Sequence, residues 1–318
     1  MNKTNWARMC LALLLLIFSF NVSAQKTFKN PILPGFHPDP SICRVENDYY
    51  MVTSSFEWFP GLPIFHSKDL VNWEQIGHVL DRPSQLQMKD GLKASNGLWA
   101  PTIRYHQGTY YVICTATGCG GNFFVTADSP EGPYSEPIFI KDAPGIDPSL
   151  FFDEDGTMWY CGSINGDNKI PPRRYPAEDR IYVQQLDPST GQFIGERHIV
   201  SSGYAINSPY AEAPHIYKIK GKYYLMIAEG GTWENHAVSV FTADNIVGPY
   251  TPFICNPVLT HRHLGNDIDI TTIGHADLVQ TQNGDWYSVM LGVRPVNGFN
   301  MLGRETFLTP VELSLIHI

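Results

Sequence analysis

The stretch His37-Pro38-Asp39-Pro40-Ser41-Ile42 decides the fold, because its Asp-Pro-Ser-Ile core returns four more times along the chain. The later copies are Ala100-Pro101-Thr102-Ile103, Asp147-Pro148-Ser149-Leu150, Ala213-Pro214-His215-Ile216 and Ala276-Asp277-Leu278-Val279. Each copy is followed by an aromatic pair, at Tyr49-Tyr50, Tyr110-Tyr111, Trp159-Tyr160, Tyr223-Tyr224 and Trp286-Tyr287. Five copies at a period of roughly 50 to 65 residues are the signature of a repeat architecture.

The sequence between these motifs indicates strands and no helices. Short runs rich in Tyr, Val, Ile and Thr alternate with turn pairs such as Lys-Gly and Asn-Gly, which are strand and hairpin signals. Each repeat therefore predicts one four-stranded antiparallel sheet that opens at the motif. Five such sheets predict an all-β, five-bladed β-propeller over residues 25–312, with the first strand of each blade lining the central axis.

The two ends of the chain are predicted to lie outside the propeller. Basic residues precede an apolar run over residues 9–20, and small residues at 22–24 fit a cleavage site. Residues 1–24 are therefore predicted to be a signal peptide, since the apolar run is too short to cross a bilayer. We expect a secreted or periplasmic protein with no membrane association after cleavage. Residues 313–318 carry no turn or cap, and we interpret them as a truncation scar beyond which a further domain is missing.

Charge and composition exclude several classes of function. The 318-residue chain has a formal net charge of −9, and loss of residues 1–24 would make it more acidic because that segment contains no acids. An acidic protein repels nucleic acid and anionic membranes, but it has no electrostatic reason to avoid a neutral ligand. No Gly-rich phosphate loop stands at a strand–helix junction, so we expect no required cofactor.

The five motifs differ at the two positions where each repeat opens. The opening position holds Asp39, Ala100, Asp147, Ala213 and Ala276, and the preceding position holds Pro38, Trp99, Ile146, Glu212 and His275. In a propeller these positions meet at one mouth of the central channel. A strand-end cap explains one Asp before Pro, but three convergent carboxylates cost electrostatic energy. Carboxylates facing an aromatic wall suit glycoside hydrolysis, in which one acid protonates the leaving oxygen while a second carboxylate acts across the sugar.

The sequence also resembles glycoside hydrolase family 43, which contains β-xylosidases and α-L-arabinofuranosidases. The resemblance runs from about Asn30 to Val311 and is carried by NPILPGFHPDPS (30–41), LWAP (98–101), GIDPS (145–149), AEAPH (211–215), EGGT (229–232), GHAD (274–277) and LGRET (302–306). It implies a five-bladed propeller and single-displacement, inverting hydrolysis. It also implies that the missing C-terminal part is a β-sandwich domain, which in many relatives closes one side of the pocket.

The resemblance implies a role for each carboxylate. Asp39 would be the general base that activates water, Glu212 the general acid, and Asp147 the carboxylate that orients the acid and tunes its pKa. Arg304 would hold a sugar hydroxyl and keep a cation near Asp39, which helps that carboxylate to stay ionised. The residues expected to bind the substrate are Phe56, Trp99, Ala100, Thr232, His275 and Arg304.

His275 has two interpretations. The resemblance places it on the axis, where an equivalent histidine in some relatives faces a central water or calcium ion. One histidine does not make a hard-cation site, so a packed, hydrogen-bonded histidine is the preferred interpretation and we expect no metal site.

The function predicted from the sequence is exo-acting, inverting release of terminal xylose from plant hemicellulose oligosaccharides. An α-L-arabinofuranosidase or an endo-arabinanase is the alternative among enzymes, and the expected partner is a xylo- or arabino-oligosaccharide. A non-catalytic carbohydrate-binding propeller is the alternative from another class.

Overall fold

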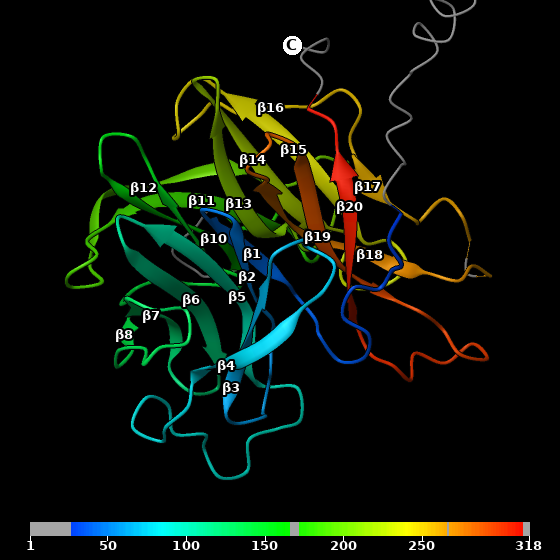
Figure 1. Ribbon diagram of the computed structural model, residues 1–318. Coiled ribbons are helices and arrows are strands. Elements are labelled where there is room, and N and C mark those ends of the chain that lie inside the picture. The colour runs from blue at the N-terminus through cyan, green and yellow to red at the C-terminus, as the bar shows by residue number, and fades with distance from the viewer. Residues whose placement is uncertain (1–26, 166–171, 266, 314–318) are drawn as a thin grey trace, which may run out of the picture.

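The computed structural model describes residues 27–165, 172–265 and 267–313. The described residues form twenty strands, which assemble into five antiparallel sheets around a common centre (Figure 1). In that view the sheets follow one another from β3 and β4 at the bottom, through β7 and β8 at the left and β16 at the top, to β20 at the right. The predicted five-bladed β-propeller is confirmed. The predicted signal peptide and residues 314–318 lie outside the described residues, within which no helix is long and apolar enough to cross a membrane.

The first three blades each contain four consecutive strands. Blade 1 comprises β1 (Ser41–Val45), β2 (Asp48–Val52), β3 (Gly61–Ser67) and β4 (Glu74–Leu80). Blade 2 comprises β5 (Gly97–His106), β6 (Thr109–Thr117), β7 (Gly121–Ala127) and β8 (Ile138–Phe139). Blade 3 comprises β9 (Ser149–Phe152), β10 (Met158–Asn165), β11 (Asp179–Leu186) and β12 (Phe193–Ser201).

The last two blades depart from this count. Blade 4 comprises β13 (Glu212–Ile219), β14 (Lys222–Glu229), β15 (Ala237–Ala243) and β16 (Thr251–Pro252), with β17 (Leu259–Thr260) also paired to β15. Blade 5 has three regular strands instead of the expected four, namely β18 (Thr271–Gln280), β19 (Trp286–Val293) and β20 (Glu305–Val311).

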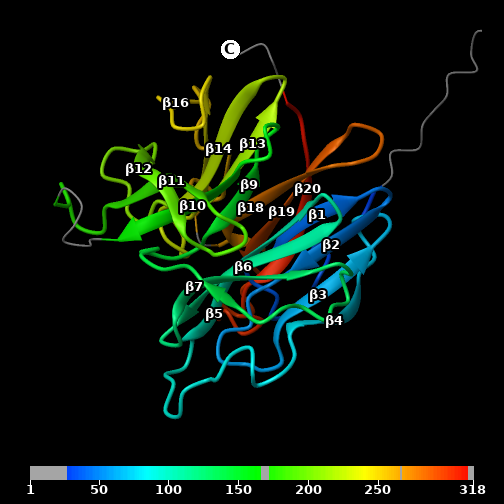
Figure 2. The same ribbon diagram turned by 90° about the vertical axis from the view of Figure 1, so that its left-hand side faces the viewer.

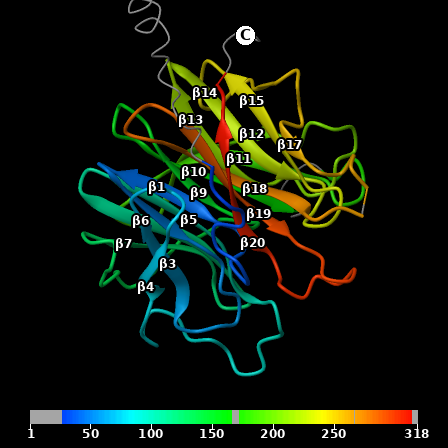
Figure 3. The same cartoon turned by 45° about the vertical axis from the view of Figure 1, so that its right-hand side comes forward.

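A segment from the start of the chain takes the fourth position in blade 5. The Ile32 amide donates to the Thr306 carbonyl at 2.9 Å, and Leu33 forms an antiparallel bridge with Thr306. The side-chain amide of Asn30 exchanges two hydrogen bonds with the backbone of Leu308. The blue N-terminal segment therefore lies beside the red β20 and closes the ring of blades (Figure 3).

The hydrophobic core is divided among the blade interfaces. Five apolar clusters fill the spaces between neighbouring blades, and the cluster between blades 1 and 2 contains Ile64, Leu98 and Phe123. Seen from the side in Figure 2, the β4–β5 connection (residues 81–96) extends below β5, away from the packed sheets. Because the core lies between the sheets, the axis remains available for polar side chains.

At the start of the first, inner strand of each blade, one residue has a positive φ and adopts the left-handed backbone conformation. These residues are Asp39 (φ 55°), Ala100 (φ 41°), Asp147 (φ 55°), Ala213 (φ 49°) and His275 (φ 48°). The opening position assigned to Ala276 from sequence is therefore wrong by one residue, and His275 occupies it. The strand register is interrupted at this place in blades 2, 4 and 5. Such a bulge re-aims the side chains at the strand entrance, and a strained backbone position repeated in five blades indicates a shared constraint.

Two residues beyond each of these positions, a polar side chain contacts another blade. The five residues are Ser41, Thr102, Ser149, His215 and Asp277, which we call the axial ring. The Thr102 hydroxyl of blade 2 donates to the Pro148 carbonyl of blade 3 at 3.0 Å, and the Ser149 hydroxyl donates to Pro214 of blade 4. The Ser41 hydroxyl of blade 1 accepts from the Ile103 amide of blade 2 at 3.1 Å.

Asp277, which is fully buried, completes the axial ring. Its carboxylate accepts from the Ser41 hydroxyl at 2.6 Å, from the Tyr217 hydroxyl at 2.6 Å and from Arg104 Nη1 at 2.8 Å. Arg104 Nη2 also donates to His215 Nδ1 at 2.8 Å. Blades 1, 2, 4 and 5 therefore share one buried charge-assisted network, one layer from the strand entrances that carry the carboxylates.

Candidate active site

The mouth of the channel is built from the strand entrances and from the loops that return to the same end. Each inner strand begins there, and each second strand ends there. The loops after β2, β14 and β19 therefore bring Phe56, Thr232 and Arg304 to the side of the molecule that carries Asp39 and Glu212.

Asp39 is a buried carboxylate held by three partners. Arg304 Nη1 donates to Asp39 Oδ1 at 2.7 Å, and the Ser54 hydroxyl donates to Oδ2 at 2.6 Å. His275 Nδ1 lies 3.6 Å from Oδ1. Burial alone would raise the pKa of Asp39, but Arg304, His275 and the Ser54 hydrogen bond together outweigh burial and lower it. Asp39 is therefore ionised at neutral pH, as a general base requires.

Asp147 and Glu212 are perturbed in the opposite direction. Burial, followed by the negative charge of Asp39, raises the pKa of Asp147 to about 8. Burial, followed by the charges of Asp147, Asp179 and Asp39, raises the pKa of Glu212 well above the ordinary carboxyl range. Neighbouring carboxyl groups whose pKa values are shifted in opposite directions are expected for an acid and a base that work at the same pH.

An aromatic wall flanks the carboxylates on the side of blades 1 and 2. The Phe56 ring lies 6.2 Å from Trp99 and 5.8 Å from Phe36, between ring centroids, and the Arg304 guanidinium stands 5.3 Å from the centre of the Phe56 ring. The Trp99 indole donates to the Ser95 carbonyl at 2.7 Å, which fixes the ring.

Hydrogen bonds connect the aromatic wall to Asp39. The Ala100 amide donates to the Ser54 hydroxyl at 2.7 Å, and that hydroxyl donates to Asp39. Phe56 and Leu98 exchange two backbone hydrogen bonds across the interface of blades 1 and 2. Gly97 makes this approach feasible, because a Cβ there would lie 2.2 Å from the Phe56 carbonyl oxygen.

The structure thus brings Phe56, Ala100, His275 and Arg304 into one connected group with Asp39, with Trp99 packed beside it. Thr232 lies in the β14–β15 loop of blade 4, and its buried hydroxyl has no hydrogen-bond partner among the described residues. A substrate contact for Thr232 remains a prediction.

Sequence reasoning missed His236, which lies beside the same group. Its Nδ1 donates to the Thr272 carbonyl at 2.9 Å, so Nε2 is a buried acceptor, and it has no partner within the described part of the chain. Burial lowers the pKa of His236 to about 4. A Cβ on Gly274 would lie 2.4 Å from the imidazole, so the glycine of GHAD makes room for this ring.

The surroundings of His275 do not fit a calcium ion. Calcium prefers six to eight oxygen ligands, whereas His275 is near the Arg304 cation and the imidazoles of His215 and His236. The nearby carboxylates, Asp39 and Asp277, are already bound to Arg304 and Arg104. Across the described residues, no group of three or more His, Cys, Asp or Glu side chains could hold a metal ion.

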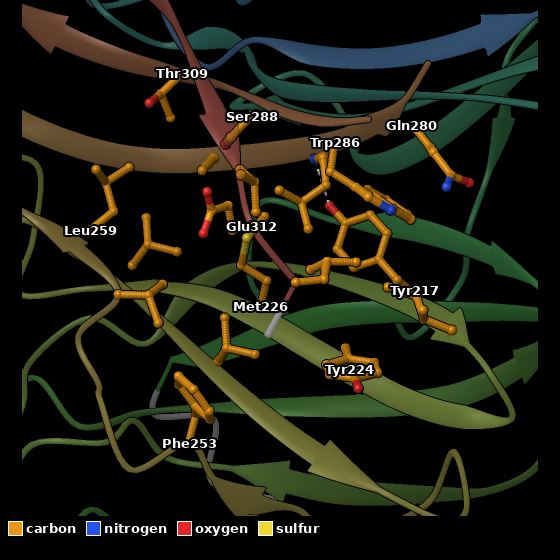
Figure 4. A pocket seen from close by; sticks show the side chains of 18 of the residues that line it. Tyr217, Tyr224, Met226, Phe253, Leu259, Gln280, Trp286, Ser288, Thr309 and Glu312 are labelled. Atoms are coloured by element: carbon orange, nitrogen blue, oxygen red, sulfur yellow. Dashed lines mark hydrogen bonds between the residues drawn. The ribbon is translucent and has the colours of Figure 1, made fainter. Parts of the chain in front are cut away.

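A separate groove of about 840 Å³ lies between blades 4 and 5 (Figure 4). Its lining includes Tyr224 and Met226 of blade 4, Trp286 and Ser288 of blade 5, and Glu312 at the end of β20. None of the three carboxylates lines this groove, so it is not the candidate active site.

The fold and the mouth define a propeller with an acid–base carboxylate centre, the arrangement of a glycoside-hydrolysing protein. The sequence profile of the glycosyl hydrolases family 43 matches residues 28–314. The chain belongs to this family.

Known relatives agree with this assignment. The chain is 48% identical over 284 residues to a Butyrivibrio fibrisolvens protein named xylosidase/arabinosidase, covering 89% of this chain and 54% of that protein. It is 47% identical to a Bacteroides ovatus non-reducing end alpha-L-arabinofuranosidase, covering 95% of this chain and 55% of that protein. The crystal structure of a Bacillus halodurans xylan beta-1,4-xylosidase superposes with a TM-score of 0.84 at 40% identity, covering 92% of this chain and 56% of that one. The chain spans about half the length of these relatives.

Proposed function

We propose that this propeller is the catalytic domain of an exo-acting, inverting glycoside hydrolase that releases terminal xylose from hemicellulose-derived oligosaccharides. The observation that carries the proposal is that the pKa of Asp39 is lowered while the pKa of Glu212 is raised within one cluster of carboxylates. Relatives named for xylosidase and arabinosidase activities support the substrate class.

The chemistry follows from the protonation states. Ionised Asp39 accepts a proton from water, and the oxygen of that water attacks the anomeric carbon of the terminal sugar. Glu212 gives its proton to the leaving oxygen as the glycosidic bond breaks. Attack and departure occur on opposite faces, so one displacement inverts the anomeric configuration.

The other residues of the site set the protonation states of Asp39 and Glu212 and hold the sugar. Negative charge at Asp147 disfavours ionisation of the neighbouring Glu212, so that the acid retains its proton. Arg304 keeps Asp39 ionised and offers its remaining N–H groups to a sugar hydroxyl. Phe56 and Trp99 offer apolar faces to the C–H face of the ring.

An α-L-arabinofuranosidase is the second candidate, because the Bacteroides ovatus relative carries that name. Comparing kcat/KM on 4-nitrophenyl β-D-xylopyranoside and 4-nitrophenyl α-L-arabinofuranoside decides between the two sugars. A non-catalytic carbohydrate-binding propeller is tested in parallel with Asp39→Asn and Glu212→Gln. Oligosaccharide binding without turnover, unchanged in both variants, would show that the propeller only binds. We expect turnover in the wild type and its loss in both variants.

The expected localisation, secreted or periplasmic, belongs to the same proposal. It rests on the signal-peptide pattern of residues 1–24. Cell fractionation of the native host, with an antibody against the propeller, tests it.

A further inference from the structure

We propose that Tyr210 and Trp233 form an aromatic shelf beside Glu212 that holds the sugar ring on the leaving-group side of the scissile bond. This inference rests on the proposed function and deepens it, because it assigns a binding site for the second sugar of the substrate. The ligand class is a neutral pyranose joined to the terminal sugar.

The shelf belongs to the same blade as the acid. Tyr210 precedes Glu212 by two residues, and Trp233 lies in the loop between β14 and β15 of blade 4. Their ring centroids are 5.8 Å apart, with planes tilted by 54°. Tyr210 is 37% exposed and Trp233 is 55% exposed, so both rings present apolar surface to solvent at the mouth.

A buried scaffold holds the shelf in this exposed position. Glu229, which is fully buried, accepts from the Ser239 hydroxyl at 2.9 Å and from the Tyr204 amide at 2.8 Å. The Gly230 amide donates to the Pro209 carbonyl at 2.9 Å. The segment that carries Tyr210 and the loop that carries Trp233 are thereby fastened together at their bases.

The local backbone is specialised for the same contact. Tyr210 has a φ of 56°, an uncommon conformation for an aromatic residue, and its amide donates to the Ala177 carbonyl of blade 3 at 2.9 Å. A Cβ on Gly231 would lie 2.5 Å from the Trp233 ring and 2.9 Å from the Tyr210 ring. Strain that the surrounding structure maintains is typical of ligand-binding positions.

A polar pair from blade 3 lies near Glu212. Arg173 Nη2 donates to Asp179 Oδ1 at 2.9 Å, and Arg173 Nε donates to the Glu178 carbonyl at 2.9 Å. Asp179 is close enough to Glu212 to raise the pKa of that acid. The Arg173 side chain is 41% exposed, so a partly exposed hydrogen-bond donor is also available to a sugar near Glu212. Pyranose rings offer an apolar face and a hydroxyl edge that match the shelf and this donor.

The positions of acid and base decide which sugar the shelf holds. Asp39 lies on blade 1 and Glu212 on blade 4, and these blades are not neighbours in the ring. In a single displacement the leaving group departs from the face opposite the attacking water. It therefore departs on the side of blade 4, where the shelf lies, whereas Phe56 and Arg304 hold the terminal sugar beside the base.

The test compares Trp233→Ala with Trp58→Ala on two substrates. Trp58 is a matched control, because it is 68% exposed in the β2–β3 loop of blade 1, on the side of the base. Xylobiose carries a sugar ring on the leaving-group side, and β-D-xylopyranosyl fluoride carries none. We expect Trp233→Ala to lower kcat/KM on xylobiose at least about fivefold, because alanine removes the apolar ring face against which the second sugar packs. On the fluoride, kcat/KM should stay within about twofold of wild type.

Two results would refute the proposal that this shelf holds the second sugar. One is an equal loss on both substrates in Trp233→Ala, and the other is a loss on xylobiose in Trp58→Ala as large as in Trp233→Ala. Trp233→Phe, which keeps an aromatic face, should recover most of the xylobiose activity and guards against a folding defect in the alanine variant. Failure of the proposed function is a separate outcome, because the wild-type protein would then hydrolyse neither substrate.

Discussion

Replacing Arg304 with Gln should move the acidic limb of the pH–rate profile to higher pH. The Arg304 guanidinium donates to Asp39 at 2.7 Å and, after burial, is the largest influence on the pKa of that carboxylate. Without this cation, burial is opposed by His275, by the Ser54 hydrogen bond and by His236. The pKa of Asp39 must therefore rise, and the base becomes protonated at a pH where the wild-type base is still ionised.

The size of the shift follows from the geometry of the pair. An opposite charge within about 4–6 Å lowers a carboxyl pKa by about 1–3 units, and each unit corresponds to about 1.4 kcal/mol. Asp39 is almost fully buried, while the Arg304 side chain is 24% exposed, so solvent screens part of the attraction. We expect the acidic limb of kcat/KM to move upward by about 1–2 pH units.

The assay is kcat/KM against pH on the preferred 4-nitrophenyl glycoside, with Arg304→Lys as the matched control. Lysine keeps a positive charge near Asp39, so its acidic limb should move less than that of Arg304→Gln. Both variants lose contacts to the sugar, which lowers the height of the profile without moving its limbs. An unmoved acidic limb in Arg304→Gln would refute the reasoning, because Asp39 would then not be the group that the limb reports.

Four further predictions concern the acid, its tuner, the axial ring and metal dependence. Glu212→Ala should lose most activity on xylobiose and much less on the activated nitrophenyl glycoside, since a good leaving group needs little protonation; equal losses would count against the acid assignment. At pH 8, Asp147→Asn should have a free energy of unfolding about 2–4 kcal/mol higher than wild type, measured by urea unfolding. The folded pKa of Asp147, about 8, lies above the ordinary value of 3.8, so the wild-type carboxyl destabilises the fold at pH values where the unfolded chain ionises it. That gain should vanish as the pH falls through 8 towards 4, and a gain independent of pH would contradict it. Asp277→Asn should lower unfolding stability by about 3–5 kcal/mol, since it leaves Arg104 buried without its anion, whereas Ser41→Ala should cost only about 1 kcal/mol; equal losses would show that the charge is not decisive. Dialysis against EDTA should leave kcat/KM unchanged, and activity restored only by added calcium would reject our view of His275.

The five motifs predicted the propeller because each blade repeats one strand entrance. The same repetition contained a signal that the sequence reasoning did not use, namely the polar residue two positions after the opening residue. Ser41, Thr102, Ser149 and His215 interrupt otherwise apolar strands. The structure shows that the first three join neighbouring blades, and that His215 of blade 4 is hydrogen-bonded to Arg104 of blade 2. Asp277 was hidden because a bulge shifts the fifth repeat by one residue, and motif alignment does not detect bulges.

Other features of the site depend on contacts between distant segments. The chain segment at residues 30–33 completes blade 5, a pairing across more than 270 residues that no local pattern predicts. His236 and Asp179 lie outside the repeated motif and approach the carboxylates only through the loop and strand geometry of blades 4 and 3. Trp233 meets Tyr210 because two loops are fastened by Glu229, a buried carboxylate whose role is invisible in the sequence.

The most direct test of the central claim is proton NMR of the first sugar released from a β-xyloside. Asp39 acting on water while Glu212 protonates the leaving oxygen requires α-xylose to form first and the β anomer to appear only later by mutarotation. Initial formation of β-xylose would contradict the account, because it requires a covalent intermediate and two displacements.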